Sequence, residues 1–257
     1  MGSTLLQPLI AKLSARSVLS DRDVAALLRM PHTIKRFTPS EYLVRERKPA
    51  THTCILLTGF AYRQKVVPNG ARQIIGLQVP GDPVDLHNSM LDVSDHAVQG
   101  LTDGVAAMVA REDILALAAA HPNIAHAFWI DTLVDGSIAR EWIVNIGRRS
   151  AHERLAHMFC EFALRLRIAG IEQGEKLALP MTQEQIADVL GLTPVHINRM
   201  VRKFEREGLI HRAQRMVTIL RTSDLEALAG FDDTYLHIER KEPAYKGAPS
   251  IDARQSA

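Results

Sequence analysis

The chain has 257 residues, a mass of 28.5 kDa and a formal net charge of +2, so it has room for one large domain or two modest ones. Hydrophobic residues make up 46 % of the chain, which is enough to fill a core and argues against a disordered protein. No apolar run approaches the roughly 18 residues that span a bilayer, and the first residues lack a signal-peptide pattern. We therefore expect a cytoplasmic protein without membrane contact.

Two short amphipathic helices are predicted in residues 3–30, the second capped by Ser20 with Asp23 and ended by Pro31. From residue 32 the pattern changes to short strands at regular spacing, which predicts an all-β barrel or sandwich. The turn Pro68-Asn69-Gly70 is the strongest hairpin signal among them. The predicted strands cover residues 32–37, 42–45, 52–58, 60–67, 73–79, 96–101 and 105–109.

A helix is predicted from Arg111 through Ala120, and the longest helical pattern follows it from Asn123 to Arg148. One side of this long helix carries a repeating stripe, which consists of Ile124, Phe128, Asp131, Val134, Ile138, Trp142 and Asn145. Such a stripe needs a surface to pack on. That surface is either the same helix of a second chain, as in a coiled coil, or the chain's own β-domain.

After another amphipathic helix in residues 149–170, residues 182–212 have the pattern of a helix-turn-helix. Thr182 is a predicted N-cap with Gln185 as its capping-box partner, and Gly191 ends the first helix. Thr193 then caps a second helix that starts with Pro194. The outward face of this second helix carries His196, Asn198, Arg199, Arg202, Lys203 and Arg206.

Basic residues are concentrated in this region. From Thr193 to Arg221 there are seven, opposed only by Glu205 and Glu207, a pattern that attracts phosphates. Arginine and asparagine on a helix after a tight turn suit the DNA major groove. The alternative is an ordinary helical hairpin with a solvated basic face. Two short strands around residues 213–214 favour DNA binding, because a β-hairpin in this position forms the wing of a winged helix. A further helix is predicted to start with a Ser223–Glu226 capping box.

The chain resembles the Crp/Fnr family of bacterial transcription regulators, most specifically over residues 150–221. The resemblance rests on the sequence QEQIADVLGLT at residues 183–193, on Asn198-Arg199 and on EGLI at residues 207–210. It implies an α+β protein with a jelly-roll sensor domain (double-stranded β-helix) in residues 1–122, a dimerisation helix in 123–148 and a winged helix-turn-helix in 149–230. Residues 242–257, with Pro243, Gly247, Pro249 and few apolar residues, are expected to be disordered.

The same resemblance implies a homodimer on an inverted-repeat DNA operator, with RNA polymerase as a further partner. The dimer would be held through Ile124, Phe128, Val134, Ile138 and Trp142. The expected DNA contacts are Thr182, Thr193, Pro194, Val195, His196, Asn198, Arg199, Arg202, Lys203 and, in the wing, Arg215. Well-known members have a glutamate where this chain has Val195, so we expect a different operator sequence. The rival hypothesis is a sensor or scaffold module that binds no DNA.

The effector is the open question. Family members that bind cyclic nucleotides carry a Gly-Glu-Leu turn and an Arg-Ser or Arg-Thr pair, whose arginine holds the phosphate. This chain has Asp85-Leu86-His87 and Ser94-Asp95 at the corresponding places, and an aspartate there would repel a phosphate. Cyclic AMP is therefore not the expected effector.

Other cofactors are also disfavoured. Cys54 and Cys160 cannot supply the four ligands of an iron–sulfur cluster, and we expect buried, inert thiols. Haem remains an alternative because His87 and His96 are available as ligands, but such histidines are usually polar surface. His152 and His157 are five residues apart, so they cannot share a zinc ion as in zinc proteases. We expect neither a metal site nor catalytic residues.

Overall fold

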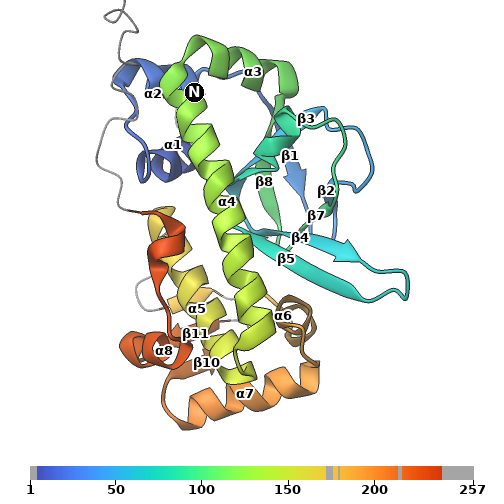
Figure 1. The fold of residues 1–257 in the computed structure, drawn as a ribbon, viewed down its shortest axis with the longest axis vertical. Coiled ribbons are helices and arrows are strands. Elements are labelled where there is room, and N and C mark those ends of the chain that lie inside the picture. The colour runs from blue at the N-terminus through green and yellow to red at the C-terminus, as the bar shows by residue number, and fades with distance from the viewer. Residues whose placement is uncertain (1–4, 172–175, 179, 214–215, 239–257) are drawn as a thin grey trace, which may run out of the picture.

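The computed structural model describes residues 5–171, 176–178, 180–213 and 216–238. Its long helix α4 (Pro122–Arg148) runs from the top to the bottom of the view in Figure 1. The β-domain lies beside the upper part of α4, and the C-terminal helices surround its lower part (Figure 1). The chain therefore has the α+β architecture expected from the sequence: a jelly-roll domain, a long helix and a helix-turn-helix.

Two short helices, α1 (Gln7–Ser14) and α2 (Asp21–Leu28), precede the β-domain. The predicted capping box at the start of α2 is confirmed. The Asp23 amide donates to Ser20 Oγ at 3.3 Å, and the Ser20 amide donates to Asp23 Oδ2 at 3.0 Å. Both helices bury apolar side chains in one cluster with the N-terminal turns of α4, so they attach that end of α4 to the β-domain.

The β-domain consists of two antiparallel four-stranded sheets with strand orders β1-β8-β3-β6 and β2-β7-β4-β5. The predicted hairpin at Pro68-Asn69-Gly70 joins β4 to β5, where the Val67 amide donates to the Ala71 carbonyl at 3.0 Å. The short strand β6 and the 3-10 helix η1 are additions to the predicted elements. The elements are β1 (Thr33–Phe37), β2 (Tyr42–Val44), β3 (His52–Thr58), β4 (Ala61–Val66), β5 (Arg72–Gln78), β6 (Pro83–Val84), η1 (Leu86–Ser89), β7 (Ala97–Gly100) and β8 (Gly104–Ala110). Helix α3 (Arg111–Ala120) follows with the predicted bounds.

The C-terminal part begins with α5 (Ala151–Ile168), capped by Ser150. The helix-turn-helix consists of α6 (Gln183–Leu190) and α7 (Pro194–Arg206). A small sheet has the strand order β10-β11-β9. Its strand β9 (Lys176–Ala178) precedes α6, and β10 (Ile210–Ala213) and β11 (Met216–Ile219) follow α7. Helices α8 (Thr222–Ala229) and η2 (Asp233–Leu236) end the described chain.

The predicted start of α8 is wrong by two residues. Its N-cap is Arg221, which makes no side-chain capping hydrogen bond, rather than Ser223. Arg221 instead forms an ion pair with Asp224 at 2.8 Å and donates to the carbonyls of Glu207 and Gly208. These contacts hold the chain as it leaves β11, so the helix starts before the serine.

The α4 stripe that was expected to form the dimer interface is covered within the single chain. Ile124, Phe128, Val134 and Trp142 are at most 6 % exposed in the single chain. Ile124 and Phe128 pack in the cluster with α1 and α2. Trp142 belongs to the cluster that contains the C-terminal helices, and Ile138 packs against that cluster. The chain's own domains thus supply the partner surface for this stripe. The apolar residues that α4 leaves exposed are Trp129, Leu133, Ile143 and Val144.

A buried group of charged side chains joins the three parts of the molecule. Lys12 on α1 lies 2.8 Å from both Asp82 in the β-domain and Asp131 on α4. Arg165 on α5 lies 2.8 Å from the other oxygen of Asp82. All four side chains are at most 13 % exposed, so water screens these pairs only weakly.

Candidate nucleic-acid interface

Local hydrogen bonds fix the turn between α6 and α7. The Gln185 amide donates to Thr182 Oγ1 at 3.1 Å, and the Thr182 amide donates to Gln185 Oε1 at 2.9 Å, so the predicted capping box is confirmed. Gly191 has φ +64°, the left-handed conformation that ends α6. The Thr193 hydroxyl then accepts from the His196 amide at 3.2 Å and caps α7. These contacts fix the orientation of α7 relative to α6.

Helix α7 has one buried and one exposed face. The inner face consists of Ile197, Met200, Val201 and Phe204, which are all buried. The opposite face is open, and Val195 near the start of the helix is 81 % exposed. Arg199 and Arg202 are exposed on this side as well. The helix therefore presents cations and an apolar side chain to any partner that approaches.

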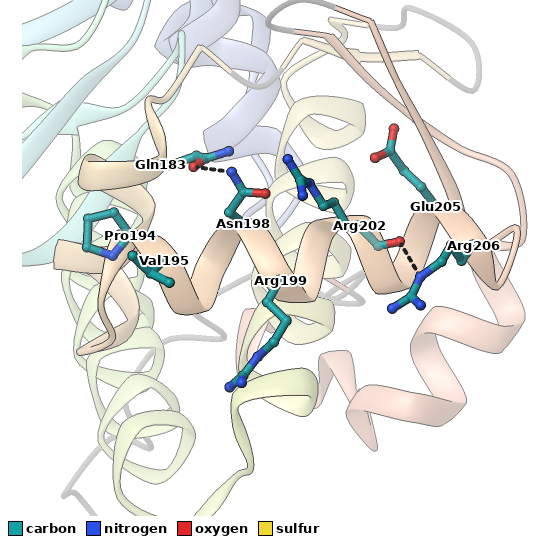
Figure 2. Close-up of a pocket in the computed structure, with 8 residues that line it drawn as sticks. All are labelled: Gln183, Pro194, Val195, Asn198, Arg199, Arg202, Glu205 and Arg206. Carbon is teal, nitrogen blue, oxygen red and sulfur yellow. Dashed lines mark hydrogen bonds between the residues drawn. The ribbon is translucent and has the colours of Figure 1, made fainter.

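An open depression of about 860 Å³ runs along this outward face. Its lining consists of Gln183, Pro194, Val195, Asn198, Arg199, Arg202, Glu205 and Arg206. Asn198 Nδ2 donates to Gln183 Oε1 at 3.1 Å, so an amide pair connects the two helices at the surface. Figure 2 shows Arg199 extending below α7, while Asn198 and Arg202 extend above it. The cationic groups therefore cover the width of the helix face.

Lys203 and His196 were predicted contacts but do not join this group, and Thr182 and Thr193 serve as the N-caps described above. Lys203 Nζ lies 3.1 Å from His152 Nδ1 and 3.6 Å from Glu207 Oε1, so the ammonium is directed toward the N-terminal turn of α5. His196 is half-buried and does not line the depression. Arg215 lies outside the described residues. The flanking strands β10 and β11 do pair as the predicted hairpin, with Ile210 opposite Ile219.

Gln183 and Glu205 are lining residues that the sequence reasoning missed. Gln183 directly follows the N-cap of α6, and the start of the first helix of a helix-turn-helix lies near the DNA backbone. That position could have identified it. Glu205 carries a charge opposite to the expected one, and Glu205 Oε1 accepts from the Arg212 amide at 3.2 Å. It therefore ties α7 to the wing.

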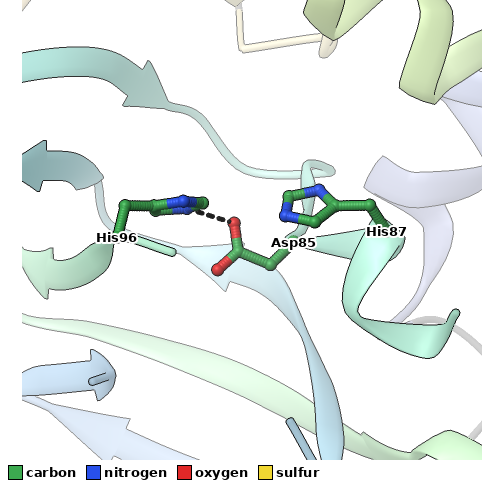
Figure 3. Close-up of side chains that lie close together, drawn as sticks. All are labelled: Asp85, His87 and His96. Carbon is green, nitrogen blue, oxygen red and sulfur yellow. Dashed lines mark hydrogen bonds and ion pairs between the residues drawn. The ribbon is translucent and has the colours of Figure 1, made fainter. Parts of the chain in front are cut away.

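The second candidate site lies in the β-domain, at the predicted effector pocket. Asp85 is fully buried and has φ +58°, and it precedes η1. His96 Nε2 lies 2.8 Å from Asp85 Oδ1, and His96 Nδ1 lies 2.7 Å from Asp95 Oδ1. His87 is on η1, with its ring centroid 5.8 Å from that of His96. Figure 3 shows the Asp85 carboxylate between the two imidazoles.

The other two predicted pocket residues do not join this group. Leu86 is buried in the apolar cluster with α1 and α2. Ser94 is buried too, and its hydroxyl donates to the His96 carbonyl at 2.9 Å, which shapes the backbone but leaves no free donor. The predicted pocket residues that come together are thus Asp85, His87 and Asp95, with His96 in the middle.

Arg63 on β4 is the pocket residue that the sequence reasoning missed. Its Nε donates to Asp85 Oδ1 at 2.9 Å, and its Nη1 donates to Asp135 Oδ2 on α4 at 2.6 Å. No local motif marks this arginine, because both partners are far away in the sequence. Arg63 therefore connects the pocket to the long helix.

The electrostatics of the pocket follow from burial and pairing. Burial alone would raise the pKa of Asp85, but the hydrogen bond to His96 and the charge of Arg63 outweigh it and lower that pKa. Burial would lower the pKa of His96, yet its bond to Asp85 raises it above the usual value. Burial lowers the pKa of His87. Asp85 is therefore ionised, and its charge is shared between Arg63 and His96.

The two histidines of α5 face different neighbours. His152 stacks on Phe204 with a centroid distance of 5.4 Å. His157 lies between Phe231 and Tyr235, with ring centroid distances of 5.3 and 5.9 Å.

Burial raises the pKa of both Cys54 and Cys160 to about 12, so both are neutral thiols at neutral pH. Among the described residues, no helix has the length and apolar character to span a membrane.

A jelly-roll domain, a long connecting helix and a winged helix-turn-helix with a basic outer face define a DNA-binding transcription regulator. Comparison with known proteins gives its family. Residues 153–228 match the Crp-like helix-turn-helix domain, and residues 34–121 match the cyclic nucleotide-binding domain. The chain belongs to the Crp/Fnr family, whose members are transcription regulators rather than enzymes.

Several relatives support this membership. The chain is 31 % identical over 196 residues to the transcriptional activatory protein AadR of Rhodopseudomonas palustris. The aligned stretch covers 76 % of this chain and 80 % of AadR. It is 30 % identical over 216 residues to the nitrogen fixation regulation protein FixK of Bradyrhizobium diazoefficiens, covering 83 % and 90 %. The solved structure of FixK2 from Bradyrhizobium japonicum has the same fold, with a TM-score of 0.70 and 24 % identity over 77 % of this chain and 97 % of FixK2.

Proposed function

We propose that this regulator binds an inverted-repeat DNA operator as a homodimer and that its effector is not cyclic AMP. The observation that carries the proposal is the outward face of α7, where Asn198, Arg199 and Arg202 line one depression. Arginine reads guanine and asparagine reads adenine in the major groove. Val195, 81 % exposed, can contact a thymine methyl group but cannot accept a hydrogen bond from cytosine.

The dimer forms through the exposed face of α4 in this proposal. The residues on that face are Trp129, Leu133, Gly136, Arg140, Ile143 and Gly147. Their spacing alternates between four and three residues, which is the repeat of a coiled-coil seam. Trp129 is 67 % exposed, Leu133 54 % and Ile143 71 %, so the described part of the chain leaves these apolar side chains uncovered. A second copy of α4 would cover these side chains.

Cyclic AMP does not suit the pocket. The buried Asp85 carboxylate and the Asp95 carboxylate flank His96 where a phosphate would need donors. The one arginine among the described pocket residues, Arg63, is already paired with Asp85 and Asp135. A cyclic phosphate would have to break one of these pairs and then lie beside the released carboxylate. Calorimetry with cyclic AMP should show no saturable binding below about 100 μM.

Selection of duplexes from a random DNA pool tests the proposed function. The full chain should enrich two half-sites in inverted orientation, with centres about 10–11 base pairs apart. Affinity for the enriched duplex should fall as salt rises, because Lys and Arg contacts release counterions. Enrichment of a single half-site would contradict the dimer, and failure to enrich any sequence would contradict operator recognition. In a bacterial cell this function places the protein in the cytoplasm, with RNA polymerase as the expected partner.

A further inference from the structure

The effector pocket contains a donor set that suits a metal ion. Asp85, His87 and His96 each direct one oxygen or nitrogen atom into the same space, and these three atoms lie within 4.8 Å of one another. Figure 3 shows that they come from separate segments: the turn before η1, η1 itself and the end of the loop before β7. The fold, rather than a local sequence motif, brings them together.

We propose that Asp85, His87 and His96 bind a divalent first-row transition metal ion such as Zn²⁺. Imidazole nitrogen and carboxylate oxygen are the ligands that such ions take in proteins. A tetrahedral ion with bonds of about 2.1 Å holds its ligand atoms roughly 3.4 Å apart. Asp85 Oδ1 and His96 Nε2 are now 2.8 Å apart. Small side-chain movements, mostly of the half-buried His87, would therefore complete the geometry.

The surroundings of His96 match those of a metal-binding histidine. A ligating imidazole usually donates its second N–H to a carboxylate, which fixes the ring and makes it a better ligand. Asp95 Oδ1 is in that position, 2.7 Å from His96 Nδ1, while Nε2 faces Asp85 and the proposed site. An ordinary surface histidine does not need this arrangement.

Asn88 is a second, independent indication. This side chain is 2 % exposed, and its Oδ1 has no hydrogen-bond partner in the described part of the chain. Its Nδ2 lies 3.5 Å from Asp85 Oδ2, so the amide group is directed at the cluster. Rotation of the amide by half a turn would offer Oδ1 to the ion or to a water molecule on it.

A path from the metal to α4 is also present. Arg63 donates to Asp85 and to Asp135 of α4. An ion that takes the Asp85 carboxylate weakens its pairing with Arg63, which leaves the guanidinium to Asp135. The ion would thereby tighten the link between β4 and the long helix. This regulatory role rests on the proposed function, whereas metal binding itself does not.

Titration of the chelator-treated full-length chain with Co²⁺ tests the site, because Co²⁺ bound by imidazole and carboxylate has visible absorption bands. Zn²⁺ should then displace it. We expect one ion per chain. The affinity for the ion should fall about 10- to 100-fold in His87→Gln and in Asp95→Asn. The imidazole of His87 makes no hydrogen bond among the described residues, and the substitution leaves its backbone bonds to Met90 and Leu91 in place, so His87→Gln should fold normally. His52→Gln, an exposed histidine on β3, is the matched control and should bind as the unaltered chain does.

Absence of saturable binding, or equal losses in His87→Gln and His52→Gln, would overturn the proposal. DNA affinity is measured in parallel with and without Zn²⁺. A chain that binds one Zn²⁺ through His87 but binds no DNA in either condition would refute the proposed function and retain the metal site. A chain that binds DNA but no metal would refute the metal site and retain the proposed function.

Discussion

Arg72 of the β-domain hairpin lies 2.6 Å from Asp188 on α6, the first helix of the helix-turn-helix. The neighbouring Gln73 donates its side-chain amide to the Val189 carbonyl on the same helix at 3.0 Å. The β4–β5 hairpin therefore holds α6 directly, without α4 as an intermediary. Because α6 and α7 are joined by a capped turn, a movement of this hairpin would also move α7, the helix proposed to read the DNA bases (the recognition helix).

Reversal of the charge at Arg72 should loosen this contact. In Arg72→Glu two carboxylates face each other. Loss of a half-exposed ion pair lowers the free energy that holds α6 against the hairpin by about 1 kcal/mol. We expect roughly five-fold faster amide hydrogen exchange in residues 186–190, with little change in the melting temperature. The double variant Arg72→Glu/Asp188→Arg restores the attraction and should restore protection. If the double variant exchanges as fast as the single one, the ion pair is not what holds α6.

Removal of the apolar seam on α4 should give a monomer. Leu133 and Ile143 are exposed in the single chain, so Leu133→Glu with Ile143→Glu leaves the fold intact but places like charges across the dimer. Sedimentation velocity would measure the change from dimer to monomer. Leu115→Glu on α3, also an exposed leucine, is the control and should remain a dimer.

The inner stripe of α4 should respond differently. Val134 is 4 % exposed, so Val134→Glu would bury a charge inside the chain and should unfold it, as measured by circular dichroism and urea denaturation. A folded, monomeric Val134→Glu would show instead that the inner stripe forms the dimer, as the sequence pattern suggested.

Capping motifs were the part of the fold that sequence reasoning predicted best. The starts of α2, α6 and α7 follow from hydrogen bonds between residues three positions apart, so the information is local. The inward face of α4 could not be assigned to a partner in this way. An apolar stripe shows that a surface is covered but not whether the same chain or a second copy covers it.

The two candidate sites also differ in how far the sequence alone could predict them. The residues that face outward from α7 could be predicted because helical periodicity separates them from Ile197, Val201 and Phe204. Arg63, His96 and Asp135 come together only through the packing of β4 and the loop before β7 against α4. A pairing across 72 residues, as between Arg63 and Asp135, leaves no periodic signal in a single sequence.

Substitutions on the recognition helix should separate base contacts from phosphate contacts. Arg199 lies in the N-terminal half of α7, which approaches base edges, whereas Arg206 lies at its last turn. Arg199→Ala should cost about 1–3 kcal/mol on the selected operator and much less on random DNA. Arg206→Ala should weaken both similarly and lower the salt slope by about one per protomer. Fluorescence anisotropy at several salt concentrations measures both. Equal losses on the two duplexes in Arg199→Ala would make Arg199 a phosphate contact.

Acid should destabilise the protein through His157. Burial, with help from the charge of Arg149, lowers the pKa of this imidazole from 6.5 to about 4. The unfolded chain binds a proton first as pH falls, so the contribution of His157 to stability is full above pH 6.5 and is lost progressively toward pH 4. The loss at pH 4 is on the order of 3 kcal/mol.

His157→Phe tests this dependence. The aromatic ring can occupy the space between Phe231 and Tyr235 but has no proton to bind. Urea unfolding between pH 7.5 and about pH 4.5 should therefore show a shallower decline for the variant than for the unaltered chain. Parallel declines in the two proteins would assign the acid sensitivity to other groups.

The charges that join α1, the β-domain, α4 and α5 also restrict how this chain can change over generations. Loss of Lys12, Asp82, Asp131 or Arg165 alone would strand an opposite charge away from water, at a cost of about 3–5 kcal/mol. That is a large share of the roughly 5–15 kcal/mol that stabilises a folded protein. Exchange of the whole set for apolar residues, together with Arg16 and Glu161, which pair with Asp131 and Arg165, carries no such penalty. We therefore expect these four positions to be inherited as one unit, with descendants that differ at one of them differing at the others too.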